Sequence, residues 1–185
     1  MYVDIEPHSF CMDPLLLKKT LDDNPNIKAV IAVHLYGNSA DIEKIADLCK
    51  SRKVKLIEDC SQAHGTFKQG KHVGTFGDIG TFSFDFAKTI TTGEGGMLTM
   101  NSKDIYEKAK AWQDHCHENN TELTRWEDSR ASSGFNYRMM ELQGAIGIAQ
   151  LKKLDFIVAS QRRNKHFLWD SIKDIHGIEA RSMPK

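Results

Sequence analysis

The sequence lacks an excess charge of either sign, a long apolar run and a leader-like start. Lys plus Arg and Asp plus Glu both total 25, which removes the general attraction that draws basic proteins to nucleic acid or anionic membranes. No apolar run approaches the roughly 20 residues that a membrane helix needs. The opening MYVDIEPHSF lacks the basic-then-apolar order of a secretory signal. We therefore expect a cytoplasmic protein with no nucleic-acid and no membrane partner.

Cysteine is scarce and shows no paired spacing, so the sequence predicts free thiols in a reducing compartment. The four cysteines are Cys11, Cys49, Cys60 and Cys116. The stretch DHCHE at 114–118 could suggest a metal site. His115 and His117 are two residues apart, however, and on a helix they would point in different directions. We expect no bound metal.

Apolar runs alternate with helix starts, an order that predicts an α/β fold with a mainly parallel sheet. IKAVIAV at 27–33 is almost wholly apolar and branched, which is typical of a strand covered on both faces. The expected strands are 2–6, 27–33, 54–57, 79–84 and 97–100. The expected helices follow Asp13–Pro14, are capped by Ser39 and by Ser102, begin near Met139, and run from about 156 to about 175.

Three reactive or polar side chains lie at or just beyond the ends of predicted strands. Asp59 follows VKLIE, Ser83 lies in TFSF, and Lys88 comes shortly after. Ligands of parallel α/β sheets bind at the carboxyl ends of the strands. A lysine, a carboxylate and a phosphate-binding hydroxyl suit pyridoxal phosphate, since the amine can react with its aldehyde and the carboxylate can pair with its ring nitrogen. From spacing alone, a solvated loop lysine and a strand-end or helix-capping aspartate remain alternatives.

Longer motifs carry a resemblance to a known family. VHLYGNSADIEKI, IEDCSQAHGTFKQGKHVGTFGDIGTFSF, KTITTGEGG and SGFNYRMMELQGAIGIAQLKKLD resemble the DegT/DnrJ/StrS family of sugar aminotransferases, which are pyridoxal phosphate enzymes with the aspartate aminotransferase fold. The resemblance runs from about residue 2 to about residue 163. It implies that the chain is the central part of a type I large domain, incomplete at both ends.

Each position of the family motifs transfers to one residue of this chain. The resemblance implies that Lys88 is the lysine that joins the cofactor and moves the proton, and that Asp59 pairs with the pyridine nitrogen. It places Gln62 near the ring hydroxyl and Ser83 at the phosphate. Asn136 matches an asparagine that reaches the phosphate of the neighbouring subunit, which implies a homodimer with shared active sites. His64 lies in the same motif, as a structural histidine or as a contact to cofactor or substrate.

The resemblance also implies a reaction and a substrate class. An amino donor, glutamate in most of the family, gives its amine to a keto sugar for cell-surface polysaccharide or lipopolysaccharide synthesis. Most relatives act on nucleotide-linked sugars. FSFDFAKTITTGEGG with DHCHENN looks most similar to the branch that aminates an eight-carbon octulosonate sugar. The polar loop 118–133 is expected to shape sugar access, with Arg125, Arg130 and Arg138 either meeting an anionic group or simply solvated.

The match lacks the family's upstream phosphate loop and its C-terminal small domain. We expect residues 1–153 to be the central cofactor-binding part and residues 154–185 to be a linking helix with the start of the small domain. A chain of this kind is expected to bind the cofactor weakly and to turn over little when alone. Two alternatives stay open. A non-catalytic fragment or interaction module could keep the fold, and the family's dehydratase branch uses the same cofactor but places histidine where Lys88 stands.

Overall fold

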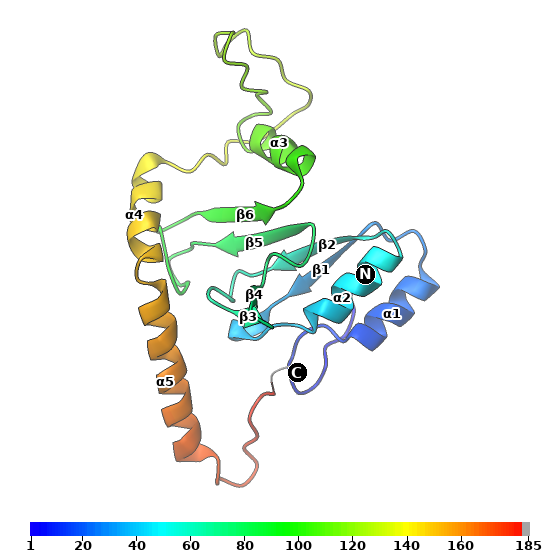
Figure 1. Cartoon of the computed structure of the whole chain (residues 1–185), viewed down its shortest axis with the longest axis vertical. Coiled ribbons are helices and arrows are strands. Elements are labelled where there is room, and N and C mark those ends of the chain that lie inside the picture. Colours follow the sequence, from blue (N-terminus) through cyan, green and yellow to red (C-terminus); the bar gives the residue numbers. More distant parts are fainter. Residues whose placement is uncertain (183–185) are drawn as a thin grey trace.

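The computed structural model describes residues 1–182 and has a central sheet with helices around it (Figure 1). The four-stranded sheet has the order β1-β2-β5-β6. Its strands are β1 (Ala29–Val33), β2 (Lys55–Asp59), β5 (Ile79–Ser83) and β6 (Gly96–Met100). The first three are parallel and β6 is antiparallel to β5. The prediction of an α/β fold with a mainly parallel sheet is therefore confirmed.

One face of β1 and β2 packs against α1 (Pro14–Asp23) and α2 (Ile42–Ser51). Alternate strand residues face this layer because side chains of a strand point to opposite faces in turn. Val30 and Ala32 of β1 and Leu56 of β2 are buried there with Leu17 of α1 and Ile45 of α2. This layer holds the larger of the two apolar cores and fixes the sheet edge where the strands end.

The remaining elements flank β5 and β6. A short helical turn η1 (Leu35–Gly37) follows β1, and the hairpin of β3 (Phe67–Lys68) and β4 (Lys71–His72) follows β2. The helix α3 (Lys103–Trp112) follows β6, and α4 (Glu141–Leu151) leads into the long α5 (Leu154–Ile172). Figure 1 shows α4 and α5 as a column beside the sheet, with the 113–140 connection projecting beyond α3.

Three sequence predictions were wrong in detail. Residues 2–6 form no strand; Ile5 makes only an isolated bridge to Met12. Ser39 does not cap α2, because its hydroxyl donates to the carbonyl of Ala40 and the helix begins at Ile42. Strand β1 is covered on one face only by the described residues, and the side chains of Ile31 and Val33 on the other face are 58% and 40% exposed.

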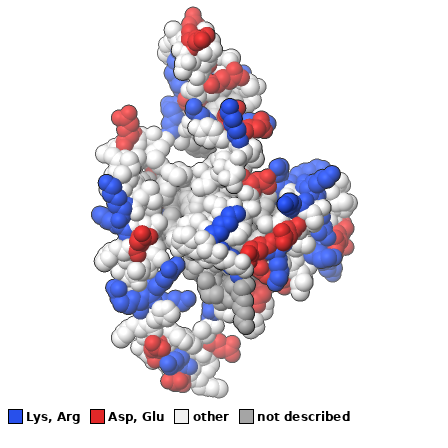
Figure 2. Space-filling view, in the orientation of Figure 1, with Lys and Arg blue, Asp and Glu red and all other residues white. Residues whose placement is uncertain are grey.

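Charge and cysteine chemistry agree with the composition. On the face drawn in Figure 2, acidic and basic side chains are interspersed over the helices, while the middle is largely uncharged. All four cysteines are free and buried. Among residues 1–182, no helix is both long enough and apolar enough to span a bilayer.

Candidate functional site

The ends of β2 and β5 bring Asp59 and Ser83 to one edge of the sheet. Each is the last residue of its strand. The strands are parallel, with Asp59 opposite Thr81, so Ser83 lies two residues further along the same edge. The Oδ1 atom of Asp59 accepts a hydrogen bond from the backbone of Ser61 at 3.0 Å, which turns the chain at the strand end. The expected placement of these two residues at the rim is confirmed.

Lys88 lies on a loop that is anchored at both sides by β5. The amide of Phe84 donates to Gly95 at 2.8 Å, and the amide of Thr92 donates to Phe84 at 3.0 Å. Within the loop, Asp85 organises a turn: its Oδ1 accepts from the amide of Ala87 at 3.1 Å, and its carbonyl accepts from the amide of Lys88 at 3.0 Å. The lysine is therefore held just beyond the strand end by local hydrogen bonds.

A pocket of about 620 Å³ lies beside this loop, within the size range of small-molecule sites. Gln62, His64 and Lys88 line it together. The other walls come from the turn after β1, from residues 65–67 and from α5. Asp59 and Ser83 do not line the pocket, although they end the strands at the same edge of the sheet.

The side chain of Gln62 is fixed by the turn after β1. Its Oε1 accepts a hydrogen bond from the amide of Tyr36 at 3.2 Å, while its carbonyl accepts from the amide of Gly37 at 2.8 Å. Tyr36 itself adopts a left-handed conformation, with φ of 51°. This turn joins the ends of β1 and β2, so the amide side chain is positioned at the pocket wall before any ligand arrives.

His64 is the buried polar group of this pocket. Its residue exposure is 8%, and its ring lies 5.8 Å from the ring of Phe82 and 5.9 Å from that of Phe84. Neither ring nitrogen makes a hydrogen bond of normal geometry within the described residues. Burial lowers the pKa of His64, the nearby backbone of Ser83 opposes that shift, and the charges of Lys88 and His72 lower the pKa further. The ring is therefore neutral at pH 7.

The helix α5 closes the pocket at Gly65. A Cβ atom on Gly65 would lie 2.8 Å from Cγ2 of Val158, and the residue has φ of 73°. The guanidinium of Arg162 donates to the carbonyl of Gly65 at 3.1 Å. Val158, Arg162 and Lys165 of α5 all line the pocket. Contact between α5 and the loop after β2 thus depends on a residue with no side chain.

Gly65→Ala is expected to lower the free energy of unfolding by about 1–3 kcal/mol, since it adds left-handed strain and crowds Val158. Gly70→Ala is the matched control: Gly70 has φ of 77° but no atom within 4 Å of its would-be Cβ, so it carries the backbone strain alone. Urea unfolding measures both variants, and hydrogen exchange along α5 locates the change. Equal losses for the two variants would contradict the close packing of α5.

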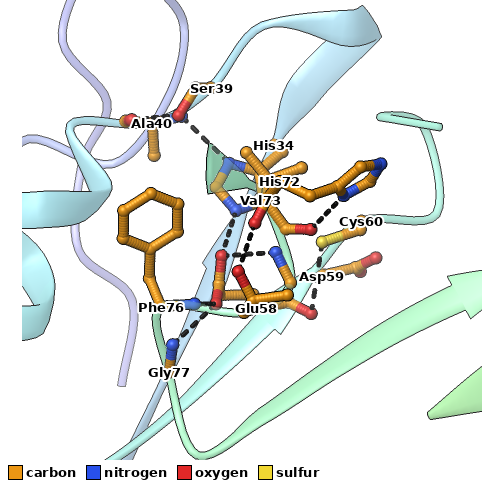
Figure 3. Close-up of polar contacts among 12 residues, drawn as sticks. His34, Ser39, Ala40, Glu58, Asp59, Cys60, His72, Val73, Phe76 and Gly77 are labelled. Carbon is orange, nitrogen blue, oxygen red and sulfur yellow. Dashed lines mark hydrogen bonds and ion pairs between the residues drawn. The ribbon is translucent and has the colours of Figure 1, made fainter. Parts of the chain in front are cut away.

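A buried carboxylate holds the loop that follows β4, and sequence reasoning missed it. Glu58 is fully buried. Its Oε1 accepts from the amides of Phe76 and Gly77, both at 2.6 Å, and its Oε2 accepts from the amide of Gly74 at 2.7 Å and contacts Nε2 of His34 at 3.1 Å (Figure 3). The signal was its two-residue spacing from Leu56 in β2, which puts both side chains on the same face.

Hydrogen bonding defines the charge state of this pair. The amide of Ala40 donates to Nδ1 of His34 at 3.1 Å, so the ring proton is assigned to Nε2, which donates to Glu58. Burial raises the pKa of Glu58, but the hydrogen bonds from His34, Gly77 and Gly74 outweigh it and leave the pKa below the ordinary value. The pair is a neutral imidazole donating to a carboxylate.

His34, Glu58 and Cys60 form the one group of described residues whose atoms are close enough to share a metal ion. Both nitrogens of His34 and both oxygens of Glu58 already have protein partners. Burial raises the pKa of the Cys60 thiol, which disfavours the thiolate that a metal needs. The group therefore acts as a structural network.

The 113–140 connection holds Asn136 and its own charge network. Asn136 is exposed and forms an isolated bridge with Asp114. Arg125 and Arg138 both pair with the carboxylate of Asp114, and these guanidinium groups hold the pKa of that carboxyl well below its usual range although burial opposes them. Arg130 donates to His117. These arginines already have partners within the loop, so neither solvated chains nor a preformed anion site describes them.

A larger hollow of about 780 Å³ lies at the opposite edge of the sheet, beside the start of β2 and the end of α2. Its lining includes Lys53, Lys55, Asp78 and Ser102. We assign the candidate site to the smaller pocket, because ligands of such sheets bind at the carboxyl ends of the strands.

Comparison with known proteins places the chain in a family. The model of the DegT/DnrJ/EryC1/StrS aminotransferase family matches residues 1–185. The chain belongs to this family. It is 42% identical to the GDP-perosamine synthase of Vibrio cholerae over 100% of this chain and 46% of that protein. It is 35% identical to the L-glutamine:2-deoxy-scyllo-inosose aminotransferase of Streptoalloteichus tenebrarius over 90% of this chain and 40% of that protein.

Solved structures of family members share the fold. The Escherichia coli GDP-4-keto-6-deoxy-D-mannose-3-dehydratase, determined with bound hydrated pyridoxal phosphate, superposes with a TM-score of 0.87 at 29% identity, over 98% of this chain and 49% of that one. The aminotransferase TlmJ of Streptoalloteichus hindustanus gives 0.91 at 27% identity, over 100% of this chain and 49% of that one. This chain therefore spans about half the length of the family members it matches.

The fold brings part of the predicted site together within one chain. Gln62 and Lys88 share a pocket with His64, and Asp59 and Ser83 end the adjacent strands. Asn136 lies on the connection between α3 and α4, outside the residues that line this pocket. The five residues keep their predicted roles as proposals.

Proposed function

We propose that this chain carries the lysine-bearing part of a pyridoxal-phosphate-dependent sugar aminotransferase. The observation that carries the proposal is the convergence of Lys88, Gln62 and the unpartnered His64 on one pocket, at the edge where Asp59 and Ser83 end their strands. The residues fit the cofactor chemically. They offer an amine for its aldehyde, a carboxylate for its ring nitrogen and polar groups for its oxygens.

Each residue has a distinct role. When bound, pyridoxal phosphate supplies an electron sink for the carbon that loses its proton. Lys88 holds the cofactor covalently and, once its amine is released, takes the proton and returns it. Asp59 keeps the ring nitrogen protonated, Ser83 donates to the phosphate, and Gln62 donates to the ring hydroxyl. The rigid turn around Gln62 supports this assignment, since a positioned donor needs little reordering on binding.

The substrate we propose is a keto sugar, with glutamate as amino donor and cell-surface polysaccharide or lipopolysaccharide as the destination. The similarity to GDP-perosamine synthases of two species, 42% and 46% identical, favours a GDP-linked sugar. The octulosonate type that the motifs suggested is the second candidate. A panel containing a GDP-linked keto sugar and an octulosonate keto sugar, each with glutamate and with glutamine, distinguishes them.

We further propose that two copies share their sites through Asn136. The residue is exposed and lies outside the pocket of its own chain, which suits a contact to a neighbouring subunit. The start of α5 at Leu154 agrees with the proposed division after residue 153. Because β1 has one uncovered face and the chain spans about half of its relatives, we expect weak cofactor binding by these residues alone.

Covalent capture tests the proposed function. The purified chain is mixed with excess pyridoxal phosphate, its visible spectrum is recorded, borohydride is added, and the labelled peptide is identified by mass spectrometry. We expect a yellow adduct and a label on Lys88. A folded sample labelled only on other lysines, or not at all, would support the alternative of a non-catalytic fragment.

The dehydratase relatives make a second function worth testing. Several solved neighbours are GDP-4-keto-6-deoxymannose-3-dehydratases. The resemblance implies histidine in that branch where this chain has Lys88, so we expect amine transfer to the sugar. Loss of a sugar hydroxyl without incorporation of nitrogen would reverse this assignment. Mass spectrometry of the sugar product distinguishes the two outcomes.

A further inference from the structure

His64 is the one buried side chain whose nitrogen or oxygen atoms have no hydrogen-bond partner among the described residues. It is enclosed by the rings of Phe82 and Phe84 on one side and borders the pocket on the other. A buried polar group without a partner costs roughly 1–3 kcal/mol. Such groups are rare in native proteins and mark a missing water, ion or ligand.

The surroundings of His64 supply no partner of their own. Phe82 and Phe84 of β5 present aromatic rings to it. The charged groups near it are Lys88 and His72, and both disfavour a charge on the ring. A neutral imidazole has one nitrogen that donates and one that accepts. It can therefore bond to a hydroxyl or an amine without bringing a second positive charge beside Lys88.

The side chains that share the pocket with His64 indicate the partner. Lys88 and Gln62 line the same pocket, whereas Asp59 and Ser83 do not. In the proposed function, Lys88 joins the aldehyde carbon of the cofactor and Gln62 donates to the neighbouring hydroxyl. His64 therefore faces the edge of the cofactor that carries these two groups, away from the ring nitrogen and the phosphate.

We propose that His64 is a further cofactor-contacting residue, whose neutral ring hydrogen-bonds to the aldehyde-and-hydroxyl edge of pyridoxal phosphate when the cofactor is joined to Lys88. This inference rests on the proposed function. It makes His64 a positioning residue for the reacting edge, because a bond from a buried ring fixes the orientation of that edge relative to the Lys88 amine. An ordered water that fills the same bonds in all states is the competing explanation.

Nuclear magnetic resonance of the full 185-residue chain with ¹⁵N-labelled histidine tests the contact. Spectra are compared before and after pyridoxal phosphate is fixed on Lys88 by borohydride, which removes the difficulty of weak binding. We expect the ring nitrogen signals of His64 to move more than those of His72. His72 is the matched control, since its ring lies 5.9 Å from the same Phe82 but does not line the pocket.

Variants add a second measurement. His64→Phe keeps an aromatic ring and removes both nitrogens. We expect roughly a two- to tenfold rise in the dissociation constant for pyridoxal phosphate, the size of one neutral hydrogen bond, with a melting temperature that is unchanged or higher. His72→Phe should leave the dissociation constant unchanged. A structural role for His64 predicts the reverse for His64→Phe, namely a lower melting temperature and unaltered binding.

The outcomes separate the two proposals. A chain labelled on Lys88 whose His64 signals stay in place would overturn the contact and leave the proposed function standing. A folded chain that forms no Lys88 adduct would overturn both.

Discussion

Lys88→Met is expected to abolish the fixation of pyridoxal phosphate, because it removes the amine that the proposed reaction requires while keeping an unbranched side chain of similar length. Loss of proton transfer alone would reduce amine transfer by about 10²–10⁴-fold, and loss of the covalent link reduces it further. The measurements are the visible spectrum after addition of cofactor, the borohydride label on the peptide around residue 88, and amine transfer to a keto sugar where turnover is detectable.

The matched control for this variant is Lys44→Met. The amine of Lys44 pairs with Asp41 on the exposed start of α2, and its side chain is 73% exposed. We expect this variant to retain the label and the spectrum. Circular dichroism should show the same helix content for both variants, since the backbone of Lys88 supplies the turn to Asp85. A Lys88→Met chain that is still labelled within the pocket would disprove the assigned role.

Glu58→Gln is expected to destabilise the chain by about 3–5 kcal/mol, the cost of breaking a buried charged pair by removing one partner. The carboxylate accepts from three backbone amides and from His34. An amide side chain of the same shape has one oxygen and adds two donors where only acceptors are needed. Given a total stability of roughly 5–15 kcal/mol, urea unfolding should show a large loss.

An exposed carboxylate provides the comparison for Glu58. Asp22 pairs with Lys18 and Arg52 at the surface, and its side chain is 43% exposed. Asp22→Asn should cost less than about 1 kcal/mol, as exposed ion pairs do. Similar losses for the two variants would show that the network around Glu58 does not hold the loop 74–77.

The Glu58 carboxyl also sets a pH dependence. Its pKa in the folded chain lies below the ordinary 4.5, so the folded state binds the proton less readily than the unfolded state. Its stabilisation is complete above about pH 4.5 and is lost as the pH falls through the lower, folded value. The stability difference between wild type and Glu58→Gln should therefore shrink as the pH falls below 4.5, because protonation removes the same charge.

The rim of the site could be predicted from the sequence because its cause is local. Branched apolar runs formed β1, β2 and β5, and their parallel order put Asp59 and Ser83 at one edge. The Gln69–Gly70 turn joined β3 to β4 with positive φ values of 49° and 77°. The helix start at Asp13–Pro14 was also confirmed, since the Asp13 carboxylate accepts from the amides of Leu15 and Leu16.

Where local signals competed, tertiary contacts decided. Ser39 has the residue type of a helix cap, but the chain at Ala40 binds His34 in the core and delays the helix until Ile42. The strand β1 reads as doubly covered, yet coverage depends on which elements reach each face, and only α1 and α2 do so here. Residue type states a preference, and the neighbours that arrive on folding determine whether it is used.

The sequence by itself determined the reacting residue, the parallel sheet and the family, because motifs and strand patterns depend on residues close together in the chain. Only the tertiary structure showed that His64 lacks a partner, that Glu58 ties β2 to the loop 74–77, and that Arg125 and Arg138 both bind Asp114. Those features join residues that are distant in sequence. Hydrogen bonding and burial depend on what the fold places within a few ångströms, and no spacing along the chain encodes that.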